Sequence, residues 1–200
     1  MQVLLADPHR DILLTYQKLF ALRGDAADCA FDGTQALTCL TQGDYQLAIV
    51  SSRLPRIRAE KIIEAARARG VPCIEMIDTH LRSAHLLSGV SACAFLSLPV
   101  SPDILFGYVD AILQKAACGE RFSVAGVTVD VRGFCLEGSG IPLTSKEIDL
   151  LRALKDGPLK DVRHLSTYIN ALNNKLAMHG QSARISYVLK KGYCVVNQNA

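Results

Sequence analysis

The stretch LAIVSSRLP, residues 47–55, decides the fold. Its first four residues are apolar, the next two are small and polar, and a proline follows at position 55. A short apolar run that ends at turn residues is typical of a strand buried on both faces of a parallel sheet. Ligands of open α/β sheets bind at the carboxyl ends of such strands, so Ser51 and Ser52 lie where a functional site is expected.

Four more apolar runs flank this strand and alternate with helical patterns. Strands are predicted over 3–6, 26–30, 71–77 and 92–96, and helices over 12–22, 34–42, 59–69, 81–88 and from 102 onward. In the last helix Ser101 is the expected N-cap, and Ile104 and Leu105 are expected to face inward. The alternation predicts an α/β fold, a flavodoxin-like doubly wound five-stranded parallel sheet over residues 1–116.

After a boundary near Lys115–Arg121 the pattern changes to that of a second, smaller α+β domain, residues 121–200. Residues 122–141 alternate β-type runs with glycine turns, which predicts an antiparallel meander. Thr144 and Glu147 form a capping box at the start of a helix over 145–155. A further helix over 162–178 and a hairpin over 185–196 complete the predicted domain.

Composition favours a globular protein outside the membrane. Half of the 200 residues are apolar and a fifth are charged, and no apolar run approaches the roughly 20 residues of a membrane span. The first residues look like a strand and not a signal peptide, so we expect a cytoplasmic protein with no membrane partner. The seven cysteines include no C-x-x-C pair. They are expected to be buried thiols, with a redox or metal role as the alternative.

Charge is divided unevenly along the chain. Residues 1–119 contain 11 Lys and Arg against 12 Asp and Glu, a net −1, whereas residues 120–200 contain 11 against 7, a net +4. A basic C-terminal part favours nucleic acid as a partner, although a solvated basic face has the same composition.

Three motifs in the second half resemble those of OmpR/PhoB-type response regulators. They are LTSKE (143–147) followed by Leu150-Leu151, then R-x-L-x-x-Y-I-x-x-L-x-x-K-L (163–176), and I-x-x-V (185–188) with Gly192-Tyr193. The resemblance covers nearly the whole chain. It implies a receiver domain, a winged-helix DNA-binding domain and a role in phosphorelay signal transduction and transcription regulation.

The receiver's phosphoryl site departs from that family. The resemblance assigns five positions, of which only Asp7 keeps the expected residue, an acid. Pro8 replaces the second acid and Ser51 replaces the phosphoacceptor aspartate. Ile77 replaces a residue with a hydroxyl, and Leu98 replaces a lysine. A serine cannot form the acyl phosphate, and one carboxylate is a poor Mg²⁺ site. Without the lysine, nothing would pair the added phosphoryl charge. We therefore expect no Mg²⁺ and no phosphodonor to act here.

Two interpretations of this altered pocket stay open. It has become part of the core, or it accepts another ligand with His9, Ser51 and Ser52 as polar groups. A Ser51 nucleophile with a His9 base lacks a third orienting group, so we predict neither an enzyme nor a cofactor.

Family members dimerise through the fourth helix, the fifth strand and the fifth helix. The fifth strand here lacks the usual acids, so the resemblance implies a homodimer with an apolar face that includes Leu86, Leu87, Phe95 and Phe106.

The DNA-binding half also departs from the family, because the chain between Leu154 and Asp161 leaves no room for the usual second helix. Ala171 and Asn173 stand where arginines are common. The residues that could still contact double-stranded DNA are Arg163, His164, Ser166, Thr167, Asn170, Asn174, Lys175, Lys190 and Lys191. The alternative is an ordinary solvated helix face.

These patterns lead to one function and one alternative. The first is a phosphorylation-independent transcription regulator with a pseudo-receiver that dimerises. The alternative is an interaction module that has lost DNA binding and docks on another regulator or signalling protein. The operator, the target genes, the direction of regulation and the signal that replaces phosphorylation are not encoded in any recognisable motif.

Overall fold

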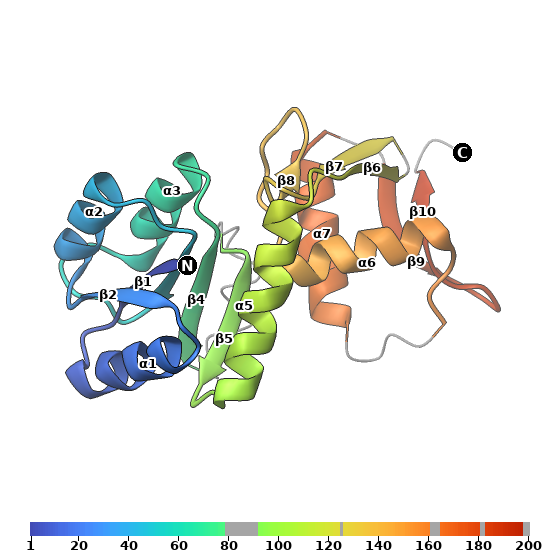
Figure 1. Cartoon of the computed structure of the whole chain (residues 1–200). Coiled ribbons are helices and arrows are strands. Elements are labelled where there is room, and N and C mark those ends of the chain that lie inside the picture. Colours follow the sequence, from blue (N-terminus) through green and yellow to red (C-terminus); the bar gives the residue numbers. More distant parts are fainter. Residues whose placement is uncertain (79–91, 125, 161–164, 181–182, 198–200) are drawn as a thin grey trace. The chain divides into compact units, whose positions relative to one another are not determined.

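The computed structural model describes residues 1–78, 92–124, 126–160, 165–180 and 183–197 (Figure 1). They form two compact units, the first from residues 1–78 and 92–114 and the second from residue 115 onward. No helix among the described residues is long and apolar enough to cross a membrane.

The first unit is built on a five-stranded parallel sheet in the order β2-β1-β3-β4-β5. The strands are β1 (Gln2–Ala6), β2 (Ala26–Ala30), β3 (Leu47–Ser51), β4 (Cys73–Asp78) and β5 (Ala94–Leu98). This order confirms the predicted flavodoxin-like sheet. Ser51 pairs in register with Met76, and Asp78 with Leu98, so the carboxyl ends of β3, β4 and β5 lie at one edge.

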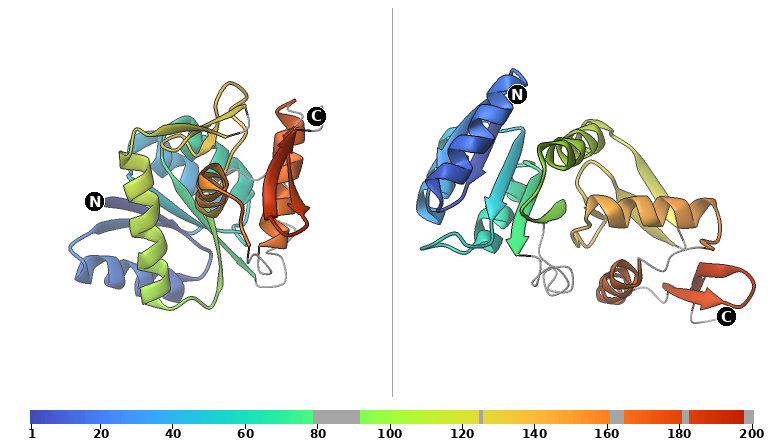
Figure 2. Two further views of the ribbon diagram at one scale, coloured as in Figure 1. Left: turned by 90° about the vertical axis from the view of Figure 1, so that its right-hand side faces the viewer. Right: turned by 90° about the horizontal axis from the view of Figure 1, so that it is seen from below.

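Helices cover both faces of this sheet (Figures 1 and 2). They are α1 (Arg10–Leu22), α2 (Gly33–Gln42), α3 (Ala59–Ala68) and α5 (Pro102–Ala117). On one face the Phe20 ring of α1 meets the Phe106 ring of α5 edge to face at 5.2 Å, and Arg23 forms an ion pair with Asp110. Because both faces are covered, every residue of β3 is buried, as its apolar run predicts.

Some boundaries and one orientation differ from the sequence prediction. Strand β4 begins after Pro72, because a proline has no N–H to donate to a neighbouring strand. The predicted inward position of Ile104 is wrong: its side chain is 54% exposed. The buried face of α5 is centred on Leu105, Val109 and Ile112, so Ile104 lies one position outside it. The helix predicted over 81–88 lies outside the described residues.

The second unit begins with the predicted antiparallel meander. Its strands are β6 (Arg121–Val124), β7 (Val127–Asp130) and β8 (Cys135–Leu136). The capping box is confirmed: the Glu147 N–H donates to Thr144 Oγ1 at 3.2 Å, and the Thr144 N–H donates to Glu147 Oε2 at 2.6 Å. It opens α6 (Ser145–Asp156), which is followed by α7 (Ser166–Met178) and the hairpin of β9 (Ala183–Val188) and β10 (Gly192–Asn197).

The segment that joins α6 to α7 takes part in β pairing. Residues 157–160 contain no helix. The Leu159 N–H donates to the Tyr193 carbonyl at 3.0 Å, and the Tyr193 N–H donates back to the Leu159 carbonyl at 2.9 Å. Leu159 therefore pairs with the edge of the hairpin. Helix α7 begins at Ser166 instead of at the predicted Val162, with Leu165 as N-cap, and residues 161–164 lie outside the described part.

Two glycines in helices of the first unit should respond to alanine in opposite ways. A Cβ at Gly33 would lie 2.6 Å from the Ile57 Cβ, whereas one at Gly107 would meet nothing within 4 Å. We expect Gly33→Ala to lower the free energy of unfolding by about 1–3 kcal/mol through overpacking. Gly107→Ala should raise it by about 0.5–1 kcal/mol through helix propensity. Urea unfolding of the full chain followed by circular dichroism measures both, and equal effects would contradict this account of Gly33.

Candidate functional site

At the carboxyl end of β1, Asp7 is held by its own loop. Its side chain is buried, and Oδ1 accepts the His9 backbone N–H at 2.8 Å and contacts the His9 ring Nδ1 at 2.9 Å. Pro8 lies between them and offers no side-chain ligand. The one carboxylate that matches the family's acidic pair is therefore already engaged with a histidine.

The other three positions lie at the ends of neighbouring strands. Ser51 ends β3 with its side chain 1% exposed, and its Oγ accepts the Arg53 N–H at 3.3 Å. Ile77 is fully buried near the end of β4. Leu98 is the last residue of β5 and precedes a cis peptide bond to Pro99. The structure thus brings a buried hydroxyl and two aliphatic side chains to this edge, with the His9 ring exposed and Ser52 half-buried beside them.

The predicted dimer face is only partly available. Phe95 is 6% exposed within β5, so it packs in the core and cannot offer an apolar surface to a second subunit. Phe106 is half-buried on α5, where it contacts Phe20 and lies 5.2 Å below the Arg23 guanidinium. Leu86 and Leu87 lie outside the described residues.

One side of α7 is polar and exposed. Ser166, Asn170 and Asn174 follow one another at four-residue spacing and face solvent, with Thr167 half-buried beside them. Ile169, Leu172 and Leu176 are buried on the opposite side. A helix with this division can place an amide and hydroxyl surface against another molecule.

Lys175, predicted to contact DNA, is not available for that role. Its side chain is 6% exposed, and its Nζ lies 2.8 Å and 3.0 Å from the two carboxylate oxygens of the fully buried Glu147. Glu147 also caps α6, so this ion pair fastens α7 to the first turn of α6. The prediction that Lys175 is exposed for DNA contact is therefore wrong, because this lysine is buried in an ion pair inside the second unit.

Asn173 has a role that the sequence did not reveal. Its Nδ2 donates to the Ile185 carbonyl at 3.0 Å, and its Oδ1 accepts the Ile185 N–H at 2.8 Å. The side-chain amide thus satisfies both backbone groups of one residue of β9. Asn173, which stands where the family often has an arginine, therefore orients the hairpin against α7.

The tip of the hairpin is basic. Lys190 has a left-handed backbone (φ +66°), the Lys191 N–H donates to the Val188 carbonyl at 3.0 Å, and both lysine side chains are exposed. Gly192 (φ +101°) lies where a Cβ would be 2.9 Å from the Leu159 carbonyl carbon, so a side chain there would push the linker off the hairpin. Arg163 and His164 lie outside the described residues.

The buried cysteines are poorly suited to redox or metal chemistry. Burial, with the neighbouring Cys93 and Glu75, raises the pKa of Cys73 well above its usual value, and burial raises the pKa of Cys93 to about 12. Both therefore stay protonated thiols near neutral pH, whereas a thiolate is the reactive form. The prediction of buried thiols is wrong for the other five cysteines: Cys118 is exposed, and the half-buried ones are Cys29, Cys39, Cys135 and Cys194.

Curated proteins similar to this chain include three bacterial regulatory proteins. It is 31% identical over 157 residues to the DNA-binding response regulator MtrA of Mycolicibacterium paratuberculosis, covering 74% of this chain and 69% of MtrA. It is 25% identical over 201 residues to the transcriptional regulatory protein TctD of Salmonella typhimurium (96% and 89%). It is 26% identical over 170 residues to the regulatory protein VanRB of Enterococcus faecalis (82% and 77%). No protein-family model matches the chain.

Solved structures support the same fold. A mutant of RitR matches 98% of this chain and 99% of its own length with a TM-score of 0.69 and 21% identity. A CheY-like receiver domain from Methanospirillum hungatei matches 56% of this chain and 93% of its own, with a TM-score of 0.52 and 20% identity. At these identities the matches describe the fold alone. The sequence similarity to MtrA shows that this chain belongs to the OmpR/PhoB-type response regulators.

The Glu147–Lys175 ion pair gives a prediction for stability. Lys175→Met would leave a buried carboxylate without its cation, and we expect a loss of about 3–5 kcal/mol in the free energy of unfolding. The double variant Glu147→Gln with Lys175→Met removes the charge and keeps an oxygen for the cap, so it should recover part of that loss. Urea unfolding of the full chain measures these changes.

Lys190→Met is the matched control, because this lysine is exposed at the hairpin tip and its loss should change stability by less than about 0.5 kcal/mol. Equal stability of Lys175→Met and Lys190→Met would show that the buried pair does not hold α7.

Proposed function

We propose that this chain is a transcription regulator that works without phosphorylation, with a pseudo-receiver over residues 1–116 and a winged-helix-like DNA-binding domain over 121–200. Relatives are named DNA-binding or transcriptional regulators and not enzymes. If chromosomal DNA is the partner, the protein works in the cytoplasm, which is the location that we propose.

The observation that carries phosphorylation independence is Ser51 at the end of β3. An acyl phosphate needs a carboxylate, and a serine 1% exposed offers only a covered hydroxyl. The donor set does not fit Mg²⁺ either, because that ion favours several oxygen ligands in octahedral geometry. Asp7 is a single carboxylate engaged with His9, Pro8 has no side-chain oxygen, and Leu98 cannot pair an added negative charge.

DNA binding is supported by two surfaces of the second unit. The exposed side of α7 offers asparagine amides, which can pair with the edge of an adenine, and hydroxyls, which suit phosphates. Lys190 and Lys191 offer two cations at the hairpin tip, where they could enter a minor groove or neutralise phosphates. With Lys175 internal, this hairpin tip supplies much of the charge within the proposed surface.

We also propose a homodimer through the first unit. One subunit offers few phosphate contacts, and two would roughly double the electrostatic contribution to affinity. With Phe95 in the core, Phe106 on α5 is the described residue of the predicted face that still reaches the surface.

One observation favours a second candidate, an interaction module that does not bind DNA. Residue Leu159 pairs with Tyr193 where the family has its second helix, so the usual support of a recognition helix is replaced. The hairpin lysines separate the two candidates, since a docking module that contacts its partner elsewhere would tolerate their reversal.

The first functional prediction concerns the hairpin. Without any phosphodonor, the full chain should retain selected genomic DNA fragments, with affinity that falls steeply as salt rises. Lys190→Glu with Lys191→Glu should weaken this retention by tenfold or more. The slope of log affinity against log salt concentration should become shallower by the amount expected for the loss of about two phosphate contacts. Filter binding across a salt series measures both quantities.

A matched control reverses the same amount of charge elsewhere. Lys18→Glu with Lys61→Glu changes two exposed lysines of the first unit and should leave retention nearly unchanged. If both double variants weaken binding equally, net charge and not the hairpin is responsible. No retention by the unmodified chain would favour the interaction module.

The second functional prediction concerns phosphorylation and assembly. Incubation with acetyl phosphate and Mg²⁺ should leave the intact mass unchanged, because no aspartate follows β3. Sedimentation at micromolar concentration should show the same dimer before and after this treatment. A mass gain of one phosphoryl group would contradict the pseudo-receiver, and a monomer under both conditions would contradict the homodimer.

A further inference from the structure

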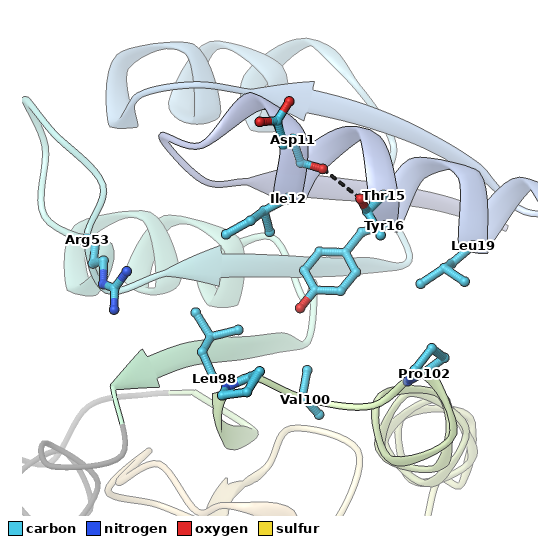
Figure 3. A pocket seen from close by; sticks show the side chains of 10 residues that line it. Asp11, Ile12, Thr15, Tyr16, Leu19, Arg53, Leu98, Val100 and Pro102 are labelled. Carbon is cyan, nitrogen blue, oxygen red and sulfur yellow. Dashed lines mark hydrogen bonds between the residues drawn. The ribbon is translucent and has the colours of Figure 1, made fainter.

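A pocket of about 530 Å³ lies beside the altered phosphoryl site, within the first unit (Figure 3). One wall is α1, with Ile12, Tyr16 and Leu19, and the opposite wall is the end of β5 and the segment after it, with Leu98 and Val100. The volume falls within the roughly 300–1,000 Å³ of small-molecule sites, and these are also lined mostly by apolar side chains.

The polar side chains that line the pocket are those of Asp11, Thr15, Tyr16 and Arg53. Figure 3 shows the Tyr16 hydroxyl directed across the pocket toward Leu98 and Val100. No described residue forms a hydrogen bond with it, whereas the nearby Thr15 hydroxyl already donates to the Asp11 carbonyl at 2.7 Å. Burial and the charge of Asp7 raise the pKa of Tyr16, so the hydroxyl stays protonated and can donate.

The position of the pocket links it to the altered site. Leu98 stands at the position of the family's lysine and also lines this wall. Leu98 makes this wall apolar, whereas Asp11 and Arg53 add charged groups to the lining, so the pocket is mainly apolar but not wholly so. The substitution that disables phosphotransfer is therefore part of what makes the cavity apolar.

We propose that this pocket binds a small, mainly apolar molecule that carries one hydrogen-bond acceptor, which the Tyr16 hydroxyl recognises. Such a ligand would supply the signal that phosphorylation supplies in the family, a role that rests on the function proposed above. The site differs from the polar handles His9, Ser51 and Ser52, since none of these lines the pocket.

The test uses 8-anilinonaphthalene-1-sulfonate, an aromatic probe with acceptor oxygens, titrated into the full chain while its fluorescence is recorded. We expect saturable binding of one probe per chain. Thr15→Trp places a large side chain at the pocket rim and should weaken binding by tenfold or more. Tyr16→Phe removes the hydrogen bond and should weaken it by about three- to tenfold, the usual value of one such bond.

Thr38→Trp is the matched control. Thr38 is also an exposed threonine that donates to the carbonyl four residues earlier, at 2.9 Å, but it lies on α2, away from the pocket. Binding should be unchanged in this variant. Val100→Trp fills the opposite wall and replaces Thr15→Trp if circular dichroism shows that variant to be unfolded.

Probe binding that does not saturate, or that Thr15→Trp or Val100→Trp leaves unchanged in a folded protein, would overturn the pocket proposal. The experiment contains no DNA, so its outcome is independent of the regulator function. DNA retention without probe binding would overturn the ligand site alone, and probe binding without DNA retention would support the ligand site and overturn the regulator.

Discussion

The burial of β3 on both faces is the constraint on which the first unit depends. A parallel strand that is covered on both sides must be apolar until it ends, and the polar residues that follow then lie at the carboxyl edge of the sheet. In-register pairing with β1 and β4 carries their ends to the same edge. The geometry of the candidate site therefore follows from the packing of the core and not from any attraction among the site residues themselves.

The second unit depends in a comparable way on one carboxylate. Glu147 caps the first turn of α6 with one oxygen and accepts the buried Lys175 ammonium with both. The same side chain thus sets where one helix begins and how the next helix packs against it. Asn173 continues this arrangement by holding Ile185 of β9. Among the described residues that the sequence assigned to DNA, Lys175 is internal, whereas the others lie on the exposed side of α7 or at the hairpin tip.

The altered phosphoryl site and the neighbouring pocket share one substituted position, Leu98. Replacing the family's acids and lysine by Pro8, Ser51 and Leu98 removes the charges that would hold a metal and a phosphoryl group. Leu98 also lines the mainly apolar cavity beside Tyr16, whereas Pro8 and Ser51 do not. In our proposal the signal still acts at the carboxyl edge of the receiver sheet, but it is a small molecule and not a phosphoryl group. The backbone at this edge tolerates the replacements because the packing of the core specifies it.

The sequence alone determined the order of strands and helices, the doubly wound sheet, the capping box and the two-domain arrangement, because these depend on periodicity and on local hydrogen bonds. The resemblance to the response-regulator family, and not the strand patterns, assigned the altered phosphoryl positions, which lie at or near the ends of these strands. Only the tertiary structure decided that Lys175 and Phe95 are internal, that Ile104 is exposed, that Leu159 pairs with Tyr193 and that Tyr16 faces a cavity. Each of these depends on a partner distant in the chain, and neither helical spacing nor residue type can identify that partner.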